Sequence, residues 1–175
     1  MKRFFLLAFA VLALTACNDD SDGAPRFAAE NTKIEDGSLT GSNIRFLGTA
    51  TATSADGAAY VDRQAEFEFA GLDNFTLYMH RTRFDDAMPA LEMRIHAQPY
   101  TPGTGAAFSF ALPSVVPQVK LPNQVGGGYT WTSLEAYTLT DVRGSVDGTV
   151  CRVGFTCDVP RLGTYRVEYE GRLLE

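Results

Sequence analysis

The chain has 175 residues, of which 45% are hydrophobic and 21% charged, and its formal net charge is −6. This composition excludes a disordered chain and a collagen, and the uninterrupted apolar runs fall short of the roughly 20 residues that a membrane-spanning helix needs. An acidic chain without a basic cluster is also poorly suited to nucleic acid, so we expect no nucleic-acid partner. The length fits one domain.

The first 16 residues have the layout of a secretory signal peptide. Lys2 and Arg3 precede an apolar stretch, 4–14, and the run Leu14-Thr15-Ala16-Cys17 follows. This run resembles a bacterial lipobox, in which the cysteine thiol is diacylated and the peptide is cut before it. The resemblance implies that Cys17 becomes the lipidated first residue of an exported protein at the outer membrane or cell surface. The alternative is an ordinary signal peptide cut near Ala16.

A polar segment separates this signal from the rest of the chain. The residues 18–23 are small, polar and acidic, so they cannot bury apolar surface. We therefore expect three parts: a lipoprotein signal peptide at 1–16, the lipidated cysteine with a flexible tether at 17–41, and a folded domain at 42–175. The lipid on Cys17 would hold that domain at the membrane.

From about Ser42 onward, apolar and polar residues alternate with period two, and turn residues arrive about every ten positions. The pattern predicts nine or ten strands, at 43–53, 59–69, 75–80, 91–96, 107–112, 115–121, 129–137, 139–146, 149–157 and 164–173. Pro117 cannot donate to a sheet, which makes its strand weak or an edge. Sequential hairpin-like strands favour an all-β fold, an antiparallel meander β-barrel of about 8–10 strands, over a sandwich.

Several stretches resemble the calycin-like β-barrel lipoproteins of Bacteroides-type bacteria. They are the run 78–89, YMHRTRFDDAMP, and the C-terminal sequence from Gly144-Ser145-Val146 through Phe155-Thr156-Cys157 to Tyr165-Arg166-Val167. The resemblance covers about residues 40–175 together with the lipobox. It implies a calycin- or lipocalin-like barrel and an exported address, with at most ligand binding, and it brings no catalytic motif.

Aromatic residues are the main candidates for a binding site. In a small barrel they either fill the interior or line a cavity that is open at one end. The possible ligand-lining residues are Phe67, Phe69, Phe75, Phe108, Phe110, Trp131, Tyr165 and Tyr169. A second candidate is the loop after residue 80, where Arg81, Arg83, Phe84 and Met88 are expected to cap the barrel mouth or form a contact surface.

The sequence contains few of the residue patterns that catalysis or metal binding requires. No Gly-x-Ser-x-Gly, Walker, dinucleotide or zinc-helix motif is present, so we expect neither an enzyme nor a cofactor. His80 and His96 could meet across a hairpin, with Glu92, Asp85 and Asp86 nearby as oxygen ligands. Both histidines fall on the polar face of their strands, however, so we expect solvated side chains and no metal site.

Cys151 and Cys157 are separated by six residues of a predicted strand. Such a strand spans roughly 20 Å, whereas bonded cysteines need α-carbons within about 7 Å. We therefore expect no disulfide and two buried free thiols. A small disulfide loop would require a turn at Gly154.

Two functions remain open at this stage. The first is a binding module for a small apolar ligand or a glycan, motivated by the aromatic residues. The second is a structural or protein-interaction lipoprotein of the cell envelope, with a filled barrel and no ligand.

Overall fold

The computed structural model describes residues 32–35, 38–41, 43–71 and 73–174, and within them it contains thirteen strands and one short 3-10 helix. The predicted signal peptide, the lipidation site Cys17 and residues 18–31 of the expected tether lie outside the described residues. No helix of the length and apolarity needed to cross a membrane occurs in the described part of the chain.

The elements follow one another closely along the chain. They are β1 (Thr32–Glu35), β2 (Ser38–Gly41), β3 (Asn43–Ser54), β4 (Ala59–Gly71), β5 (Phe75–Thr82), β6 (Leu91–Gln98), β7 (Thr101–Pro102), β8 (Ala107–Val115), β9 (Gln118–Pro122), β10 (Tyr129–Ser133), η2 (Glu135–Tyr137), β11 (Leu139–Asp147), β12 (Val150–Val159) and β13 (Gly163–Leu173). β1 and β2 pair with each other and fall within the segment expected to be a tether.

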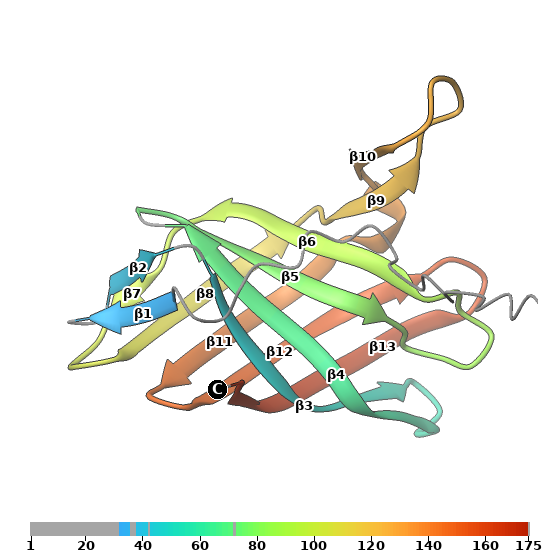
Figure 1. Ribbon diagram of the computed structural model, residues 1–175. Helices are drawn as coiled ribbons and strands as arrows, with labels where there is room; N and C mark the ends of the chain where they lie inside the picture. The colour runs from blue at the N-terminus through green and yellow to red at the C-terminus, as the bar shows by residue number, and fades with distance from the viewer. Residues whose placement is uncertain (1–31, 36–37, 42, 72, 175) are drawn as a thin grey trace, which may run out of the picture.

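Eleven of the strands form one antiparallel sheet that curls into a half-barrel (Figure 1). Their order is β10-β9-β6-β5-β4-β3-β13-β12-β11-β8-β7. The predicted all-β, antiparallel fold is therefore confirmed. Most sequence neighbours are also sheet neighbours, as in a meander, and β3 pairs with β13 to bring the two ends of the domain together.

The main departure from a simple meander lies around Pro117. The predicted strand 115–121 is divided there, because β8 ends at Val115 and β9 begins at Gln118. β8 pairs with β11 in one half of the sheet, whereas β9 pairs with β6 in the other half. The chain thus crosses from one side of the half-barrel to the other at the residue that cannot donate a ladder hydrogen bond.

β9 and β10 form a hairpin that projects beyond the sheet (Figure 1). β9 contacts β6 through only two register pairs, Met93 with Val119 and Arg94 with Gln118. The expected strand at 129–137 ends early, because the chain turns into η2 after Leu134, whose N–H donates to the carbonyl of Pro117 at 3.0 Å. The hairpin therefore extends the structure away from the main body.

The core fills the concave side of the half-barrel. Over most of the length of the long strands, alternate residues point inward, which is the direct result of the period-two pattern. Rings from opposite walls meet across the interior: Phe69 of β4 lies 5.3 Å from Phe108 of β8, and Phe75 of β5 lies 4.5 Å from Phe110, as measured between ring centroids. Aromatic side chains thus fill the space between the two walls of the curled sheet.

Candidate functional site

The residues expected to line a ligand cavity are mostly packed against one another. Phe67, Phe69, Phe75, Phe108, Phe110, Tyr165 and Tyr169 are each no more than 5% exposed and belong to one core. Phe67 stacks on Tyr169 with 3.9 Å between ring centroids, and the Tyr169 hydroxyl donates to the carbonyl of Phe46 at 2.8 Å. No phenylalanine lines the surface pockets that contain Tyr60, Lys120, Thr51 and Ala111, respectively.

Trp131 lies apart from this group. It is on β10, where its ring lies 5.7 Å from that of Tyr78 and 4.5 Å from the guanidinium carbon of Arg94. Tyr78 occupies the face of β5 opposite to the buried Leu77 and Met79. The structure therefore places Trp131 on the outer side of the sheet, outside the interior.

The loop between β5 and β6 covers one end of the half-barrel. Phe84 and Met88, two of the expected mouth-loop residues, are 2% exposed and join the core, where the ring of Phe84 packs edge-on against Phe155. Arg81 and Arg83 are exposed. The apolar residues of this loop thus insert into the core, whereas its arginines face the solvent.

Asp85 fixes the shape of this loop. One of its carboxylate oxygens accepts the N–H of Ala87 at 2.8 Å, which is an Asx-turn, and the other accepts the hydroxyl of Tyr165 at 2.8 Å. The bond to Ala87, and then the bond to Tyr165, lower the pKa of Asp85. The same carboxylate raises the pKa of Tyr165. Asp85 is therefore ionised and oriented at neutral pH.

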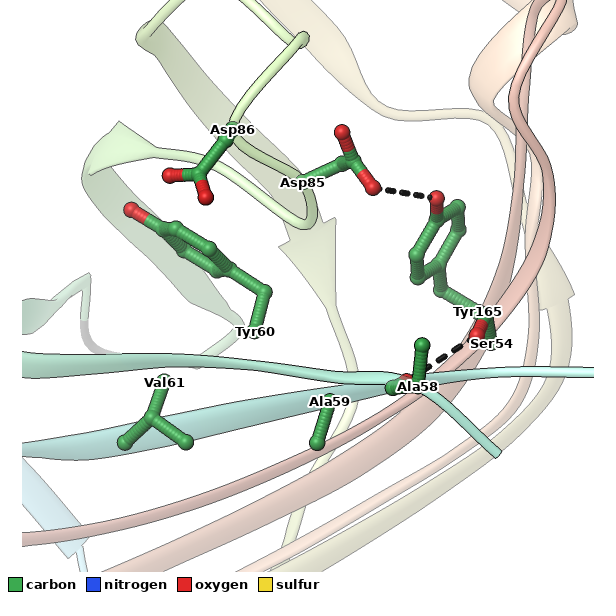
Figure 2. A pocket seen from close by; sticks show the side chains of 8 residues that line it. All are labelled: Ser54, Ala58, Ala59, Tyr60, Val61, Asp85, Asp86 and Tyr165. Atoms are coloured by element: carbon green, nitrogen blue, oxygen red, sulfur yellow. Dashed lines mark hydrogen bonds between the residues drawn. The ribbon is translucent and has the colours of Figure 1, made fainter. Parts of the chain in front are cut away.

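A pocket of about 420 Å³ opens between this loop, the turn from β3 to β4 and the start of β13 (Figure 2). We call it the Tyr60 pocket; its lining residues are Ser54, Ala58, Ala59, Tyr60, Val61, Asp85, Asp86 and Tyr165. In Figure 2 the hydroxyl end of Tyr60 faces the carboxylate of Asp86, while Asp85 faces Tyr165. Two phenol rings and two carboxylates thus converge on one open space.

The turn that forms the floor of the pocket is held by its own polar residues. Ser54 donates to the carbonyl of Ala58 at 2.9 Å, and Asp56 accepts the N–H of Ala58 at 3.2 Å. Gly57 has φ +88°, a conformation that glycine adopts without a steric penalty. The sequence Ser-Ala-Asp-Gly therefore gives a defined turn, and it places Tyr60 at the mouth of the pocket.

A second polar cluster lies on the outer face of β3–β6; we call it the His80 cluster. His80 Nε2 lies 2.9 Å from a carboxylate oxygen of Glu68, and His80 Nδ1 lies 2.9 Å from one of Glu92. Glu68 is only 1% exposed, and Asn43 donates to its other oxygen. Arg45 pairs with Glu66 and lies 3.7 Å from Glu68.

The hydrogen bonds of this cluster decide the charge of His80. Burial lowers the pKa of His80, but the bonds and charges of Glu68 and Glu92 outweigh it and raise the pKa to about 9. Burial raises the pKa of Glu92, whereas His80 lowers it, and the net direction is downward. His80 is therefore a cation at neutral pH, held between two carboxylates.

The two histidines considered as a metal pair do not meet. His80 lies opposite Glu92, and His96 contacts Thr76 with 3.2 Å between Nδ1 and Oγ1. The register of the β5–β6 hairpin, with Tyr78 opposite Arg94, leaves the histidines about four residues apart along the strands, or roughly 13 Å. The register, which residue type alone does not reveal, keeps them apart.

Within the part of the chain that the structure describes, Glu66, Glu68 and His80 form a group that could hold a metal ion, since one donor atom from each lies within 4.8 Å of the others. The guanidinium of Arg45 already contacts Glu66 and lies beside Glu68, and a proton occupies the bond between His80 and Glu68 at neutral pH. A metal ion would have to displace that proton next to a fixed positive charge. The donor set therefore fits an ion-pair network better than a metal centre.

Both cysteines of the domain are free thiols within the core. Cys151 and Cys157 are buried on β12, which runs without interruption from Val150 to Val159. Cys157 directs its sulfur toward the carbonyl of Tyr137 at 3.7 Å. The thiols therefore act as small apolar side chains on one face of the strand.

The N-terminus of the chain matches a known type of protein segment. Residues 1–18 match the prokaryotic membrane lipoprotein lipid attachment site, which indicates an exported, lipid-anchored lipoprotein. No curated protein matches the sequence. The structure is similar to part of the isotype 1 transferrin binding protein B from serogroup B Neisseria meningitidis, at 15% identity and a TM-score of 0.37, over 76% of this chain and 26% of that one.

Proposed function

We propose that this protein is a lipid-anchored binding module that takes a neutral, hydroxyl-rich ligand, a glycan, in the Tyr60 pocket. The observation that supports this function is the convergence of Tyr60, Tyr165, Asp85 and Asp86 around an open space of about 420 Å³. Carboxylates accept hydrogen bonds from sugar hydroxyls, and tyrosine rings offer flat apolar faces with a polar end. These are the contacts that a sugar ring requires.

The filled interior favours a glycan over a small apolar ligand. An apolar ligand would need a cavity lined by the core rings, but those rings contact one another across the half-barrel. The Tyr60 pocket, in contrast, is polar and open. Asp85 is held by Ala87 and Tyr165 before any ligand arrives, so little ordering is needed on binding.

We also propose a cellular location and a type of β-barrel for this protein. We place the lipid on Cys17, after removal of a signal peptide at 1–16, and the anchored domain at the outer membrane or cell surface. The match of residues 1–18 to a lipid attachment site supports this anchor. The division into 17–41 as a tether and 42–175 as a calycin-like barrel belongs to the same proposal.

A glycan microarray probed with the full-length lipoprotein in detergent tests the ligand. We expect a defined set of neutral glycans to bind. Tyr60→Ala and Asp86→Asn are expected to weaken that signal at least tenfold, because Tyr60 supplies the ring and the exposed Asp86 supplies an acceptor. Asp147→Asn is the matched control, since Asp147 is an exposed aspartate at the end of β11. Loss in the control, or equal binding by all variants, would contradict the proposal.

The second candidate is a protein-interaction lipoprotein, and the β9–β10 hairpin favours it. Val125 near the tip is 89% exposed and Tyr129 is 56% exposed, on an element that projects from the sheet. A photo-crosslinking amino acid at position 125, in protein displayed on cells, tests this role. A reproducible crosslink to one protein, with the same amino acid at position 147 giving none, would favour this second function.

A further inference from the structure

A second pocket, of about 250 Å³, lies at the base of the β9–β10 hairpin, and we call it the Lys120 pocket. It is lined by Arg81, Ala90, Leu91, Glu92, Lys120 and Tyr129. Arg81 belongs to a bulge in β5, between the register pairs of Met79 and Thr82, and has φ 51°. The bulge adds a residue to the strand and so changes the direction of the side chain, which here lines the pocket.

The charge of this pocket is opposite to that of the whole chain. Its lining has two cations, Arg81 and Lys120, and one acid, Glu92, in a protein of net charge −6. Both oxygens of Glu92 are engaged: one with His80 at 2.9 Å and the other with the N–H of Arg81 at 3.0 Å. His80 is shared between Glu92 and Glu68, and Lys120 also stabilises the charge of Glu92, so the two cations and one acid leave the lining with a formal charge of +1. The pocket is therefore locally positive.

The same pocket has a flat apolar wall. Tyr129 is 56% exposed, and the ammonium of Lys120 lies 4.9 Å from the centroid of its ring. Leu91 is half-buried beside it. A cation beside an exposed aromatic face suits a ligand that joins an anionic group to a flat or ring-shaped body.

We propose that the Lys120 pocket binds the anionic group of a ring-bearing ligand, a carboxylate or a phosphate on a sugar. Arg81 and Lys120 bind the anion, and Tyr129 contacts the ring of the ligand. This site is separate from the Tyr60 pocket and does not rest on the glycan proposal. A uronic acid and a sugar phosphate share the chemistry, so the experiment must distinguish them.

Isothermal titration of the full-length lipoprotein in detergent, at constant ionic strength, tests the site with three probes: glucuronate, glucose 6-phosphate and glucose. We expect saturable binding of at least one anionic probe. Any binding of glucose, which has no anionic group, should instead be lost in Tyr60→Ala, because glucose would occupy the Tyr60 pocket. The fluorescence of Trp131 supplies a second readout, because Trp131 is the chain's single tryptophan and lies directly opposite Lys120 in the β9–β10 register. Binding at this pocket should change its emission.

Substitutions of the two cations test whether the anionic probes bind in the Lys120 pocket. Lys120→Gln and Arg81→Gln should each weaken anion binding at least tenfold, whereas Arg152→Gln, at an exposed arginine on β12, should leave it unchanged. Asp86→Asn should reduce glycan binding at the Tyr60 pocket and leave anion binding intact, so the two proposals fail separately. Absence of saturable binding by both anions, or binding that persists in Lys120→Gln and Arg81→Gln, would overturn this inference.

Discussion

The hydroxyl of Tyr165 donates a hydrogen bond of 2.8 Å to the carboxylate of Asp85. The bond joins β13 to the loop that covers one end of the half-barrel, across 80 residues of sequence. Phe84 and Met88 insert into the core on either side of Asp85. One polar contact and two apolar contacts therefore position the loop that forms a wall of the Tyr60 pocket.

Replacing Tyr165 with phenylalanine should loosen this loop while leaving the core intact. Loss of this hydrogen bond should lower the free energy of unfolding, because the carboxylate of Asp85 loses its donor on β13. We expect faster amide hydrogen exchange at residues 85–88, measured together with urea unfolding. Tyr60→Phe is the control, because it removes a hydroxyl from the same pocket and leaves the bond to Asp85. Unchanged exchange in Tyr165→Phe would show that Phe84 and Met88 alone hold the loop.

The His80 cluster predicts a loss of stability at alkaline pH. The pKa of His80 is about 9 in the folded chain, above its ordinary value of 6.5, so its contribution is complete below about pH 6.5 and is lost as the pH rises through 9. The loss amounts to at most roughly 3 kcal/mol. Urea unfolding at pH 6, 7.5 and 9.5 measures it. In His80→Gln this pH dependence should disappear; an identical slope in the variant would assign the effect to other groups.

Phe69 is expected to be the most costly single truncation in the core. Its ring contacts Phe46, Phe75, Phe108 and Phe110 and is fully buried. Phe69→Ala should lower the free energy of unfolding by about 3–5 kcal/mol, because it removes apolar contacts and leaves a cavity. Denaturant unfolding gives this value, and binding of benzene by the variant alone would reveal the cavity. A cost below about 1 kcal/mol would mean that the interior is loosely packed.

The core thiols should be inert in the folded protein. Burial, with a smaller effect of Asp158, raises the pKa of Cys157 to about 12, and burial also raises the pKa of Cys151. The thiolate is the reactive form, so maleimide should label neither residue at pH 8 without denaturant. In urea, protein from membranes should take up two labels per chain if a lipid occupies Cys17, and three if it does not. Mass spectrometry of the intact chain counts them, and rapid labelling of Cys151 or Cys157 in the native protein would contradict their burial.

The strands could be predicted from the sequence because apolar alternation follows directly from the geometry of a half-buried sheet. Val61, at 43% exposure, is an exception on β4, because strict alternation would place it on the same face as the buried Phe67 and Phe69. A bulge in β4 between Asp62 and Ala65, opposite Gly48 and Ala50 of β3, changes which residues of β4 face inward. The alternation of apolar and polar residues in the sequence does not indicate where such a bulge occurs.

The sites were harder to predict, because they depend on register and on loop placement. Glu68 reads as a solvated charge beside Phe67, yet Asn43, Arg45 and His80 cover it. Tyr60 follows a recognisable turn, but nothing in its neighbourhood indicates that Asp86 lies across from it (Figure 2). Phe84 and Met88 are predicted at the barrel mouth, and the structure shows them inserted into the core. The spacing of four between two apolar residues in a loop is the sequence feature that could have indicated this insertion.

The position of β13 has a consequence for export. Residues 163–173 lie between β3 and β12, near the middle of the sheet, and pair with both along nearly their whole length. A chain that crosses a membrane from its N-terminus can form the β3–β6 hairpins early, but the two halves of the half-barrel cannot join until these residues have emerged. The fold can therefore be completed only after residues 163–173 have been translocated, and a chain interrupted before them exposes two unpaired strands rather than a smaller stable domain.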